Sequence, residues 1–212
     1  MVESNSLKNL NKFDDLRHII PNVSRETFQK LCLYEKLLME YNKKINLISR
    51  RDGEEIWLRH FLDSAQLFPH LSEYKSSSFI DVGSGAGFPG MVLGVLGLSP
   101  VTLMDSRRKR CDFLENVSRE TKSDVKIIWG RVEEYSQKYG IIMGRAVANI
   151  SKFLDLTQSL RDKNSKIVLL KGGKFQKEIE EAKKKWDFTI TIKTSITNSN
   201  GKVLVLNNIQ PH

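Results

Sequence analysis

The sequence lacks the cysteine content of a disulfide-rich or zinc-binding protein and the long apolar run of a membrane protein. Among its 212 residues only Cys32 and Cys111 are cysteines, and they lie far apart. We expect two buried, reduced thiols and no metal site, because neither a disulfide framework nor a zinc site can be built from them. No stretch approaches the roughly 18 to 20 apolar residues of a membrane helix. No apolar signal-peptide core follows Met1, so we expect a cytoplasmic protein.

Acidic residues are in the minority. The chain holds 34 Lys and Arg against 25 Asp and Glu, which gives a net charge of +9 and a pI of about 9.5. This excess favours a polyanionic partner such as a nucleic acid. The basic run Arg107–Arg110 suits phosphate contacts, although it could also form a solvated helix face, and the run Lys183–Lys185 fits a solvated face better.

Residues 1–76 predict an N-terminal helical extension. Ser24 is a good helix N-cap, and apolar side chains then recur at three- and four-residue spacing: Phe28, Leu31, Tyr34, Leu38 and Tyr41. Residues 42–46 resemble a polar break. A second helix is expected to start at Asp52, where Glu55 three residues on completes a capping box. Its apolar face would consist of Ile56, Trp57, Phe61, Ala65 and Phe68.

Residues 77–212 predict an α/β domain, because short apolar runs alternate with helical stretches. The expected strands are Phe79–Val82, Val101–Met104, Val125–Ile128, Ile141–Met143, Ile167–Leu170, Thr189–Thr194 and Val203–Leu206. The expected helices are Pro89–Gly97, Arg108–Lys122, Ile150–Leu160 and Lys174–Trp186. Only about eight turn-prone residues separate the last two strands, too few for a parallel crossover. We therefore expect a mostly parallel seven-stranded sheet that ends in an antiparallel hairpin.

A glycine-rich turn follows the first expected strand. Gly83, Gly85 and Gly87 alternate there, and glycine lets a backbone approach a ligand closely. Residues 85–90 also spell the dinucleotide fingerprint G-x-G-x-x-G, which on its own leaves a nicotinamide-dependent oxidoreductase open. A purely structural glycine turn is the other alternative.

Three neighbouring features favour S-adenosylmethionine over a dinucleotide. The carboxylate of Asp81, at the strand end, suits a cationic sulfonium and amino-acid ligand and would repel a pyrophosphate. The ring of Phe88 stands where phosphate oxygens would need the start of the helix. Asp105 ends the second strand and can accept hydrogen bonds from both ribose hydroxyls. We therefore expect a Rossmann-like class I methyltransferase fold, with S-adenosylmethionine as cofactor and S-adenosylhomocysteine as product.

The later turns bear on the methyl acceptor. Residues 130–134 could read the adenine edge or simply begin a helix. After Ile141–Met143 the Asn/Asp-Pro-Pro-aromatic motif of many amino-group methyltransferases is absent, and no cysteine stands in the Pro-Cys or Thr-Cys context of carbon-5 pyrimidine methylation. Methylation of guanine N7 needs neither this motif nor a nucleophilic cysteine, since N7 has a free lone pair and no proton to lose. Its methylation could rest on positioning alone.

Several motifs together resemble the RsmG family, formerly called glucose-inhibited division protein B. They run in order from about Phe28 to Leu206 and comprise Tyr41–Leu47, Arg59–Ser64, Phe79–Gly90, Asp105–Ser106, Arg131–Glu134, Arg145–Ala146 and Leu170–Gly172. The Arg-His-Phe-Leu-Asp-Ser block at 59–64 makes the resemblance specific. Gly144 and Ala86 depart from the serine and proline that relatives often carry, and both lie in expected loops.

The resemblance implies transfer of a methyl group from S-adenosylmethionine to N7 of one guanine in 16S ribosomal RNA. The cofactor-binding positions that it implies are Gly83, Phe88, Val132, Glu133 and Arg145. The residue-level argument above adds Asp81, Gly85 and Asp105.

On the acceptor side the candidate residues are His60, Asp63, Arg145 and Lys171. His60 could equally be a packing residue, but the family motif favours a place in the acceptor pocket. Lys171 follows the strand Ile167–Leu170 at the carboxyl edge of the sheet, where ligands of open α/β sheets bind. We expect a monomer that acts on 16S ribosomal RNA or on the small ribosomal subunit. A methyltransferase for another RNA and a non-catalytic RNA-binding module stay open as alternatives.

Overall fold

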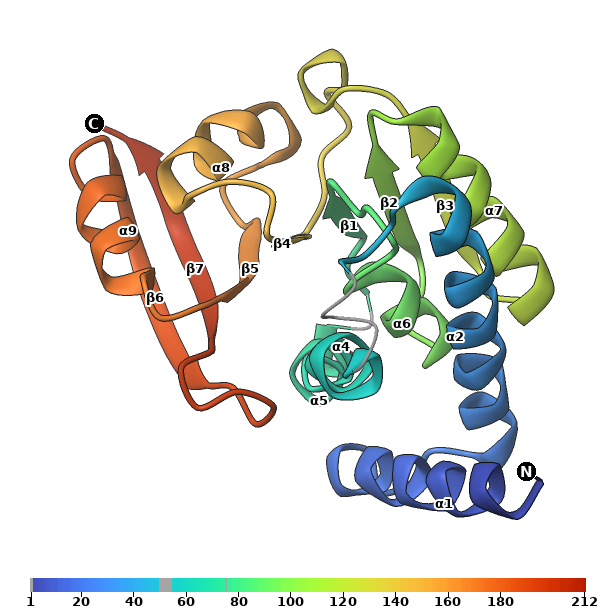
Figure 1. The fold of residues 1–212 in the computed structure, drawn as a ribbon. Coiled ribbons are helices and arrows are strands. Elements are labelled where there is room, and N and C mark those ends of the chain that lie inside the picture. The colour runs from blue at the N-terminus through green and yellow to red at the C-terminus, as the bar shows by residue number, and fades with distance from the viewer. Residues whose placement is uncertain (1, 50–54, 75) are drawn as a thin grey trace.

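A seven-stranded sheet forms the centre of the computed structural model, which describes residues 2–49, 55–74 and 76–212 (Figure 1). Its strands are β1 (Phe79–Val82), β2 (Val101–Asp105), β3 (Val125–Trp129), β4 (Ile141–Arg145), β5 (Lys166–Lys171), β6 (Trp186–Thr194) and β7 (Lys202–Pro211). They lie in the order β3-β2-β1-β4-β5-β7-β6. Strands β1 to β5 pair in parallel, whereas β7 is antiparallel to β5 and β6. The predicted sheet and its terminal hairpin are confirmed.

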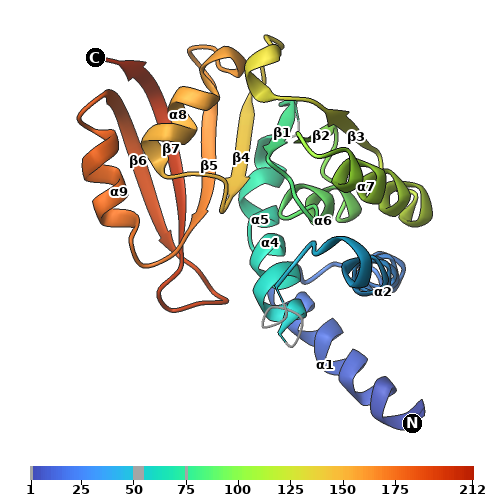
Figure 2. The same cartoon turned by 45° about the horizontal axis from the view of Figure 1, so that its top comes forward.

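Helices cover both faces of this sheet (Figure 2). They are α1 (Val2–Ile19), α2 (Arg25–Ile45), α4 (Asp63–Ala65), α5 (Phe68–Leu71), α6 (Gly90–Val95), α7 (Arg108–Thr121), α8 (Ile150–Leu156) and α9 (Phe175–Ala182). Shorter turns are the π-helical η1 (Trp57–Leu62) and the 3₁₀-helical η2 (Ser72–Tyr74), η3 (Val132–Glu134) and η4 (Gln158–Leu160). None of the helices that the structure describes is long and apolar enough to cross a membrane.

The alternation of side chains along the strands gives the sheet two hydrophobic cores. In β1, Phe79 packs on one side with residues of α2, α6 and α7. Its neighbour Ile80 packs on the other side with residues of α8 and α9. Both neighbours are fully buried, as expected for a parallel strand covered on both faces.

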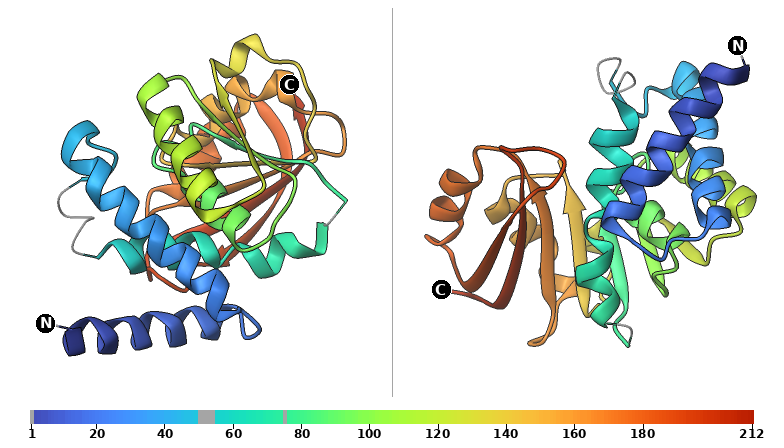
Figure 3. Two further views of the ribbon diagram at one scale, coloured as in Figure 1. Left: turned by 90° about the vertical axis from the view of Figure 1, so that its right-hand side faces the viewer. Right: turned by 90° about the horizontal axis from the view of Figure 1, so that it is seen from below.

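The N-terminal helices are part of the first core. Phe13 of α1 packs on Phe28 of α2 with ring centroids 5.1 Å apart, and Phe28 packs on Trp57 of η1 at 5.7 Å. Figure 3 shows α1 and α2 diverging from the turn that connects them. The sequence did not predict α1, because its apolar residues are sparse. The domain boundary between residues 76 and 77 stays a prediction, and the core is continuous across it.

Two helix ends differ from the sequence-based expectation. Helix α2 continues through the predicted polar break as far as Ile45, and Asn46, whose φ is +47°, is its C-cap. Two lysines in the last turn interact favourably with the negative end of the helix dipole. Helix α9 stops at Ala182, and Trp186 already begins β6, because its indole is buried in the second core. The helix start predicted at Asp52 lies outside the described residues.

The two cysteines differ in burial. Cys111 is buried as expected, whereas Cys32 is only half-buried, and both thiols are free. Burial raises the pKa of both thiols, that of Cys32 to about 11. Each thiol is therefore protonated and weakly reactive near neutral pH.

Candidate active site

The turn after β1 exposes its backbone because of glycine. Gly83 and Gly85 have φ angles of +68° and +58°, a left-handed conformation that glycine adopts without a steric penalty. A Cβ atom at Gly83 would lie 2.9 Å from Val147. The N–H groups of Gly83 and Ser84 donate to the Met104 carbonyl of β2 at 2.8 and 3.0 Å. The turn is thus fixed to the sheet and presents bare backbone at its carboxyl edge.

Asp105, the last residue of β2, supports this turn. Its Oδ2 accepts hydrogen bonds from the Gly85 N–H at 2.9 Å and from the Arg110 guanidinium at 3.2 Å. Its Oδ1 accepts one from the Arg107 N–H at 2.9 Å. An ionised carboxylate offers about four acceptor positions. A ribose would therefore compete with Arg110 if both of its hydroxyls bound here.

Asp81 lies fully buried in β1, below the glycine turn. Its Oδ2 accepts a hydrogen bond from the Gly90 N–H at 2.9 Å, which fixes the start of α6. Its Oδ1 has no hydrogen-bond partner among the described residues. Burial raises the pKa of Asp81 to about 7, although the Gly90 N–H and the charge of Arg145 partly oppose the shift. A buried acceptor that titrates near neutral pH is typical of a functional site.

Tyr34 connects the N-terminal helices to the same turn. Its buried hydroxyl donates to the Ala86 carbonyl, and its ring stacks on Phe88 at 5.6 Å. Burial raises the pKa of this phenol well above its usual value, so it stays a donor. A Cβ atom at Gly87 would fall on the Tyr34 hydroxyl and 2.8 Å from Leu114. Helix α2 therefore packs directly against the glycine turn.

The turn borders a cavity of about 1070 Å³. The predicted site residues that line it are His60, Asp63, Gly83, Gly85, Phe88, Arg145 and Lys171. Asp81 and Asp105 lie behind the glycine turn. Val132 and Glu133 lie in η3, past the end of β3, and are not part of the lining that the structure describes.

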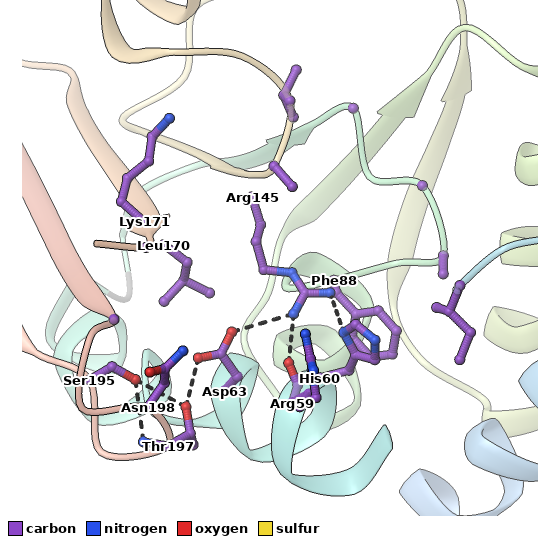
Figure 4. A pocket seen from close by; sticks show the side chains of 18 of the residues that line it. Arg59, His60, Asp63, Phe88, Arg145, Leu170, Lys171, Ser195, Thr197 and Asn198 are labelled. Carbon is purple, nitrogen blue, oxygen red and sulfur yellow. Dashed lines mark hydrogen bonds and ion pairs between the residues drawn. The ribbon is translucent and has the colours of Figure 1, made fainter. Parts of the chain in front are cut away.

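Arg145, the last residue of β4, joins the sheet to η1 across this cavity (Figure 4). Its guanidinium donates to the Arg59 carbonyl at 2.9 Å, to Asp63 Oδ2 at 3.3 Å and to His60 Nδ1 at 2.6 Å. It also lies 5.1 Å from the centroid of the Phe88 ring, on which His60 stacks at 4.8 Å. The structure thus brings together His60, Asp63 and Arg145, although η1 and β4 are far apart in the sequence.

The loop between β6 and β7 is attached to the same group. Asp63 Oδ1 accepts hydrogen bonds from Thr197 Oγ1 and from Gln66 Nε2, both at 2.8 Å. The Gln66 amide also donates to Ser195 Oγ at 3.1 Å and accepts from the Ile196 N–H at 3.0 Å. Sequence analysis missed these partners. The one sequence signal for these partners was the high content of Ser, Thr and Asn after β6, which is equally typical of a turn.

Lys171, the last residue of β5, has different partners. Its Nζ donates to the Ala148 carbonyl at 2.5 Å and to Glu178 Oε2 at 2.8 Å. Glu178 also accepts a hydrogen bond from the Ile150 N–H at 3.1 Å. Figure 4 shows the Lys171 side chain directed away from Asp63. Lys171 therefore joins β5 to α9 and to the start of α8.

Comparison with known proteins decides the family. Residues 27–207 match the model described as rRNA small subunit methyltransferase G. A protein of Rickettsia prowazekii is 38% identical over 187 residues, which cover 88% of this chain and 97% of that protein. A protein of Rickettsia typhi is 39% identical with the same coverage. Both are named ribosomal RNA small subunit methyltransferase G. The chain belongs to this family.

The enzyme class predicted from the sequence, an S-adenosylmethionine-dependent methyltransferase, is confirmed by this membership. Solved structures confirm the fold of this methyltransferase. Magnesium protoporphyrin IX methyltransferase of Synechocystis superposes with a TM-score of 0.60 at 12% identity, over 82% of this chain and 97% of that one. The ribosomal protein L11 methylase of Lactobacillus delbrueckii subsp. bulgaricus gives 0.54 at 14%, over 68% and 78%.

The site of this methyltransferase fits the cofactor of its class. The glycine turn leaves room for a ligand against the backbone at Gly85, where an added Cβ would meet nothing closer than 3.8 Å, whereas the Val147 side chain fills that space at Gly83. Beneath it, Asp81 retains an acceptor that no described residue uses, which suits a ligand with a cationic end. Within the described part of the chain, no group of three His, Cys, Asp or Glu side chains could hold a metal ion.

The first prediction concerns Tyr34. Tyr34→Phe should keep the ring stack but leave the buried Ala86 carbonyl without its donor, which costs about 1–3 kcal/mol of unfolding free energy. It should also weaken S-adenosylmethionine binding, because the glycine turn loses its attachment to α2. Denaturant unfolding and calorimetry measure the two effects. Tyr41→Phe, in the same helix, is the control, since its hydroxyl bonds to no described residue. Equal behaviour of the two variants would contradict this role.

The second prediction concerns the raised pKa of Asp81. A cationic cofactor favours the ionised carboxylate, so its affinity should rise as the pH increases through about 7. Without cofactor the sign reverses. The folded protein binds the proton more tightly than the unfolded chain, so the stability that Asp81 contributes is greatest below pH 3.8 and is lost as the pH rises to about 7. Asp81→Asn should flatten both profiles. An unchanged affinity profile in this variant would assign the titration to another group.

Proposed function

We propose that this methyltransferase transfers a methyl group from S-adenosylmethionine to N7 of one guanine in 16S ribosomal RNA. The relatives are named for the ribosomal RNA of the small subunit. The observation that carries the proposal is that the glycine turn lines the same cavity as His60, Asp63 and Arg145. Cofactor and acceptor can therefore meet without a domain movement. We further propose a monomer that acts in the cytoplasm on the RNA or on the small subunit.

The cofactor, when bound, supplies a methyl group activated by a sulfonium. We propose that the methionine end lies against Gly83, Gly85 and Phe88, with Asp81 contributing its charge from below. Asp105 would accept from the ribose, and Val132 and Glu133 would border the adenine. The position of Asp105 next to the Gly85 N–H supports this order, because it puts the ribose acceptor one strand away from the glycine turn.

The acceptor side of the cavity provides fixed geometry. The Arg145 guanidinium has five N–H donors. Its described contacts are with His60, Asp63 and the Arg59 carbonyl. We propose that it orients both cofactor and guanine, and that His60 and Asp63 keep it in place. Lys171 acts as a positioning residue, because its ammonium is already held by Glu178 and the Ala148 carbonyl.

No general base is needed in this mechanism. N7 attacks with its own in-plane lone pair, and no proton leaves the base. The contribution of the protein is then to hold N7 in line with the methyl–sulfur bond and to exclude competing water.

The third prediction tests the acceptor. Mass mapping of 16S ribosomal RNA from cells with and without this protein should show one guanine that loses one methyl mass when the protein is absent. Adding the purified protein and S-adenosylmethionine to the unmodified RNA, or to small subunits, should restore that mass. A change at another base, or in another RNA, would overturn the proposed acceptor.

The fourth prediction tests the mechanism. Arg145→Lys should lower the single-turnover rate by about 10²-fold, because an ammonium cannot reproduce the fork of contacts that sets the geometry. Thr197→Ser, which keeps its hydroxyl, is the control and should retain the rate. At saturating S-adenosylmethionine, which removes the effect of Asp81 on cofactor affinity, variants of His60, Asp63 and Lys171 should change the magnitude of the rate but leave its pH profile flat. A saturated rate that follows the ionisation of one side chain would show that a base takes part.

A further inference from the structure

The three tryptophans of the chain differ sharply in burial. Trp57 and Trp186 are 6% and 4% exposed, whereas Trp129 is 56% exposed. Trp129 is the last residue of the edge strand β3 and pairs in register with Asp105 of β2. Since Asp105 contacts the Gly85 N–H, the indole lies at the carboxyl edge of the sheet, two strands from β1 and its glycine turn. More than half of the Trp129 surface is therefore open to solvent at this edge.

The indole of Trp129 is held in one orientation. Its Nε1–H donates to the Ser106 carbonyl at 3.2 Å. The Arg108 guanidinium lies 5.3 Å from the ring centroid and is itself held by Asp112 at 2.7 Å. A ring fixed from two sides loses little further freedom on binding a flat partner. At 56% exposure, it still offers open aromatic surface to such a partner.

Further cationic side chains lie close in sequence to this ring and to its contacts. Arg107 follows Ser106 and caps α7, Lys109 follows Arg108, and Arg131 lies two residues after Trp129; all three are exposed. Arg110, one residue further along α7, turns inward to Asp105 and lines the active-site cavity. The acidic residues on the same segments include Asp112, which is paired with Arg108, and Glu133 and Glu134, which are exposed. The patch therefore has a positive balance and is continuous with the cavity through α7.

An exposed aromatic ring flanked by arginine and lysine matches the chemistry of an unpaired nucleotide. The ring stacks on the base, whatever its identity, and the cations contact the flanking phosphates. We propose that Trp129 is a stacking platform for an unpaired base of the substrate RNA, outside the catalytic cavity, with Arg107, Lys109 and Arg131 as its phosphate contacts. This inference rests on the proposed function, because it takes RNA as the substrate.

The kinetic test compares Trp129→Ala with Trp129→Phe on 16S ribosomal RNA and on small subunits, both from cells that lack the protein. Loss of one base–aromatic stack should raise the KM for the RNA substrate by about tenfold in the alanine variant. The phenylalanine variant should recover much of this loss. The kcat at saturating RNA and the Kd for S-adenosylmethionine should stay unchanged in both. Ile192→Ala, which removes another exposed apolar side chain on β6, is the control.

The salt dependence of RNA affinity tests the charged part of the patch. Replacing Arg107, Lys109 and Arg131 by glutamine should reduce the dependence of RNA affinity on salt, because fewer counterions are released on binding.

Tryptophan fluorescence gives a direct signal of contact between Trp129 and RNA. Titration with the same RNA should quench the wild-type protein, and the quenching should be lost in Trp129→Phe, since Trp57 and Trp186 are buried.

An unchanged KM in Trp129→Ala, or quenching that persists in Trp129→Phe, would overturn the platform. A weaker Kd for S-adenosylmethionine in the alanine variant would also overturn it and would make the ring a wall of the adenine site. If the wild-type protein methylates neither RNA substrate, the proposed function fails. The fluorescence titration then still decides whether Trp129 contacts RNA.

Discussion

The parallel register of β1 to β5 is the constraint on which the rest of the site depends. Strands that run in the same direction finish at the same edge, so residues far apart in the sequence meet there. The strands end at Val82, Asp105, Trp129, Arg145 and Lys171. The glycine turn continues directly from the first of these. A one-residue slip in any strand would turn its terminal side chain to the opposite face and separate the parts of the site.

The link between Arg145 and η1 has a different physical character. Arg145 and Asp63 each keep only 18% of their side-chain surface exposed, so both charges are largely removed from water. Such a pair adds little net stability, because desolvation offsets much of the attraction. The pair instead fixes the relative position of Arg145 and Asp63, because separating the two would leave each as a poorly solvated charge. The additional contacts of Asp63 with Thr197 and Gln66 extend this fixed geometry to the hairpin loop.

The sequence was most informative where function depends on local structure. The alternation of Gly83, Gly85 and Gly87 after an apolar run predicted the open turn, and the position of Asp105 at a strand end predicted a carboxylate beside it. Both inferences need only a few consecutive residues and the direction of a strand.

Contacts between distant segments could not be found in this way. The spacing of Tyr34 in the sequence indicated only a residue on the apolar face of a helix. The acceptor of its hydroxyl, the Ala86 carbonyl, is a backbone group and has no sequence signature. The partnership of Gln66 with Ser195 spans 129 positions and depends on how the hairpin packs against η1. Helix α1 was missed for a related reason, because its few apolar residues can be recognised as core residues only once the elements that they pack against are known.

The distribution of charge separates two tasks of the protein. Inside the cavity, Arg145 is paired with Asp63 and Lys171 with Glu178, at 3.3 and 2.8 Å. Partly buried pairs of this kind are screened only weakly by dissolved salt, so the geometry around the acceptor should vary little with ionic strength. The net charge of +9 therefore acts mainly through exposed residues such as Arg107, Lys109 and Arg131. In the proposed complex with RNA, their attraction to phosphate is sensitive to salt. The surface proposed to bind RNA and the paired charges of the cavity therefore respond differently to ionic strength.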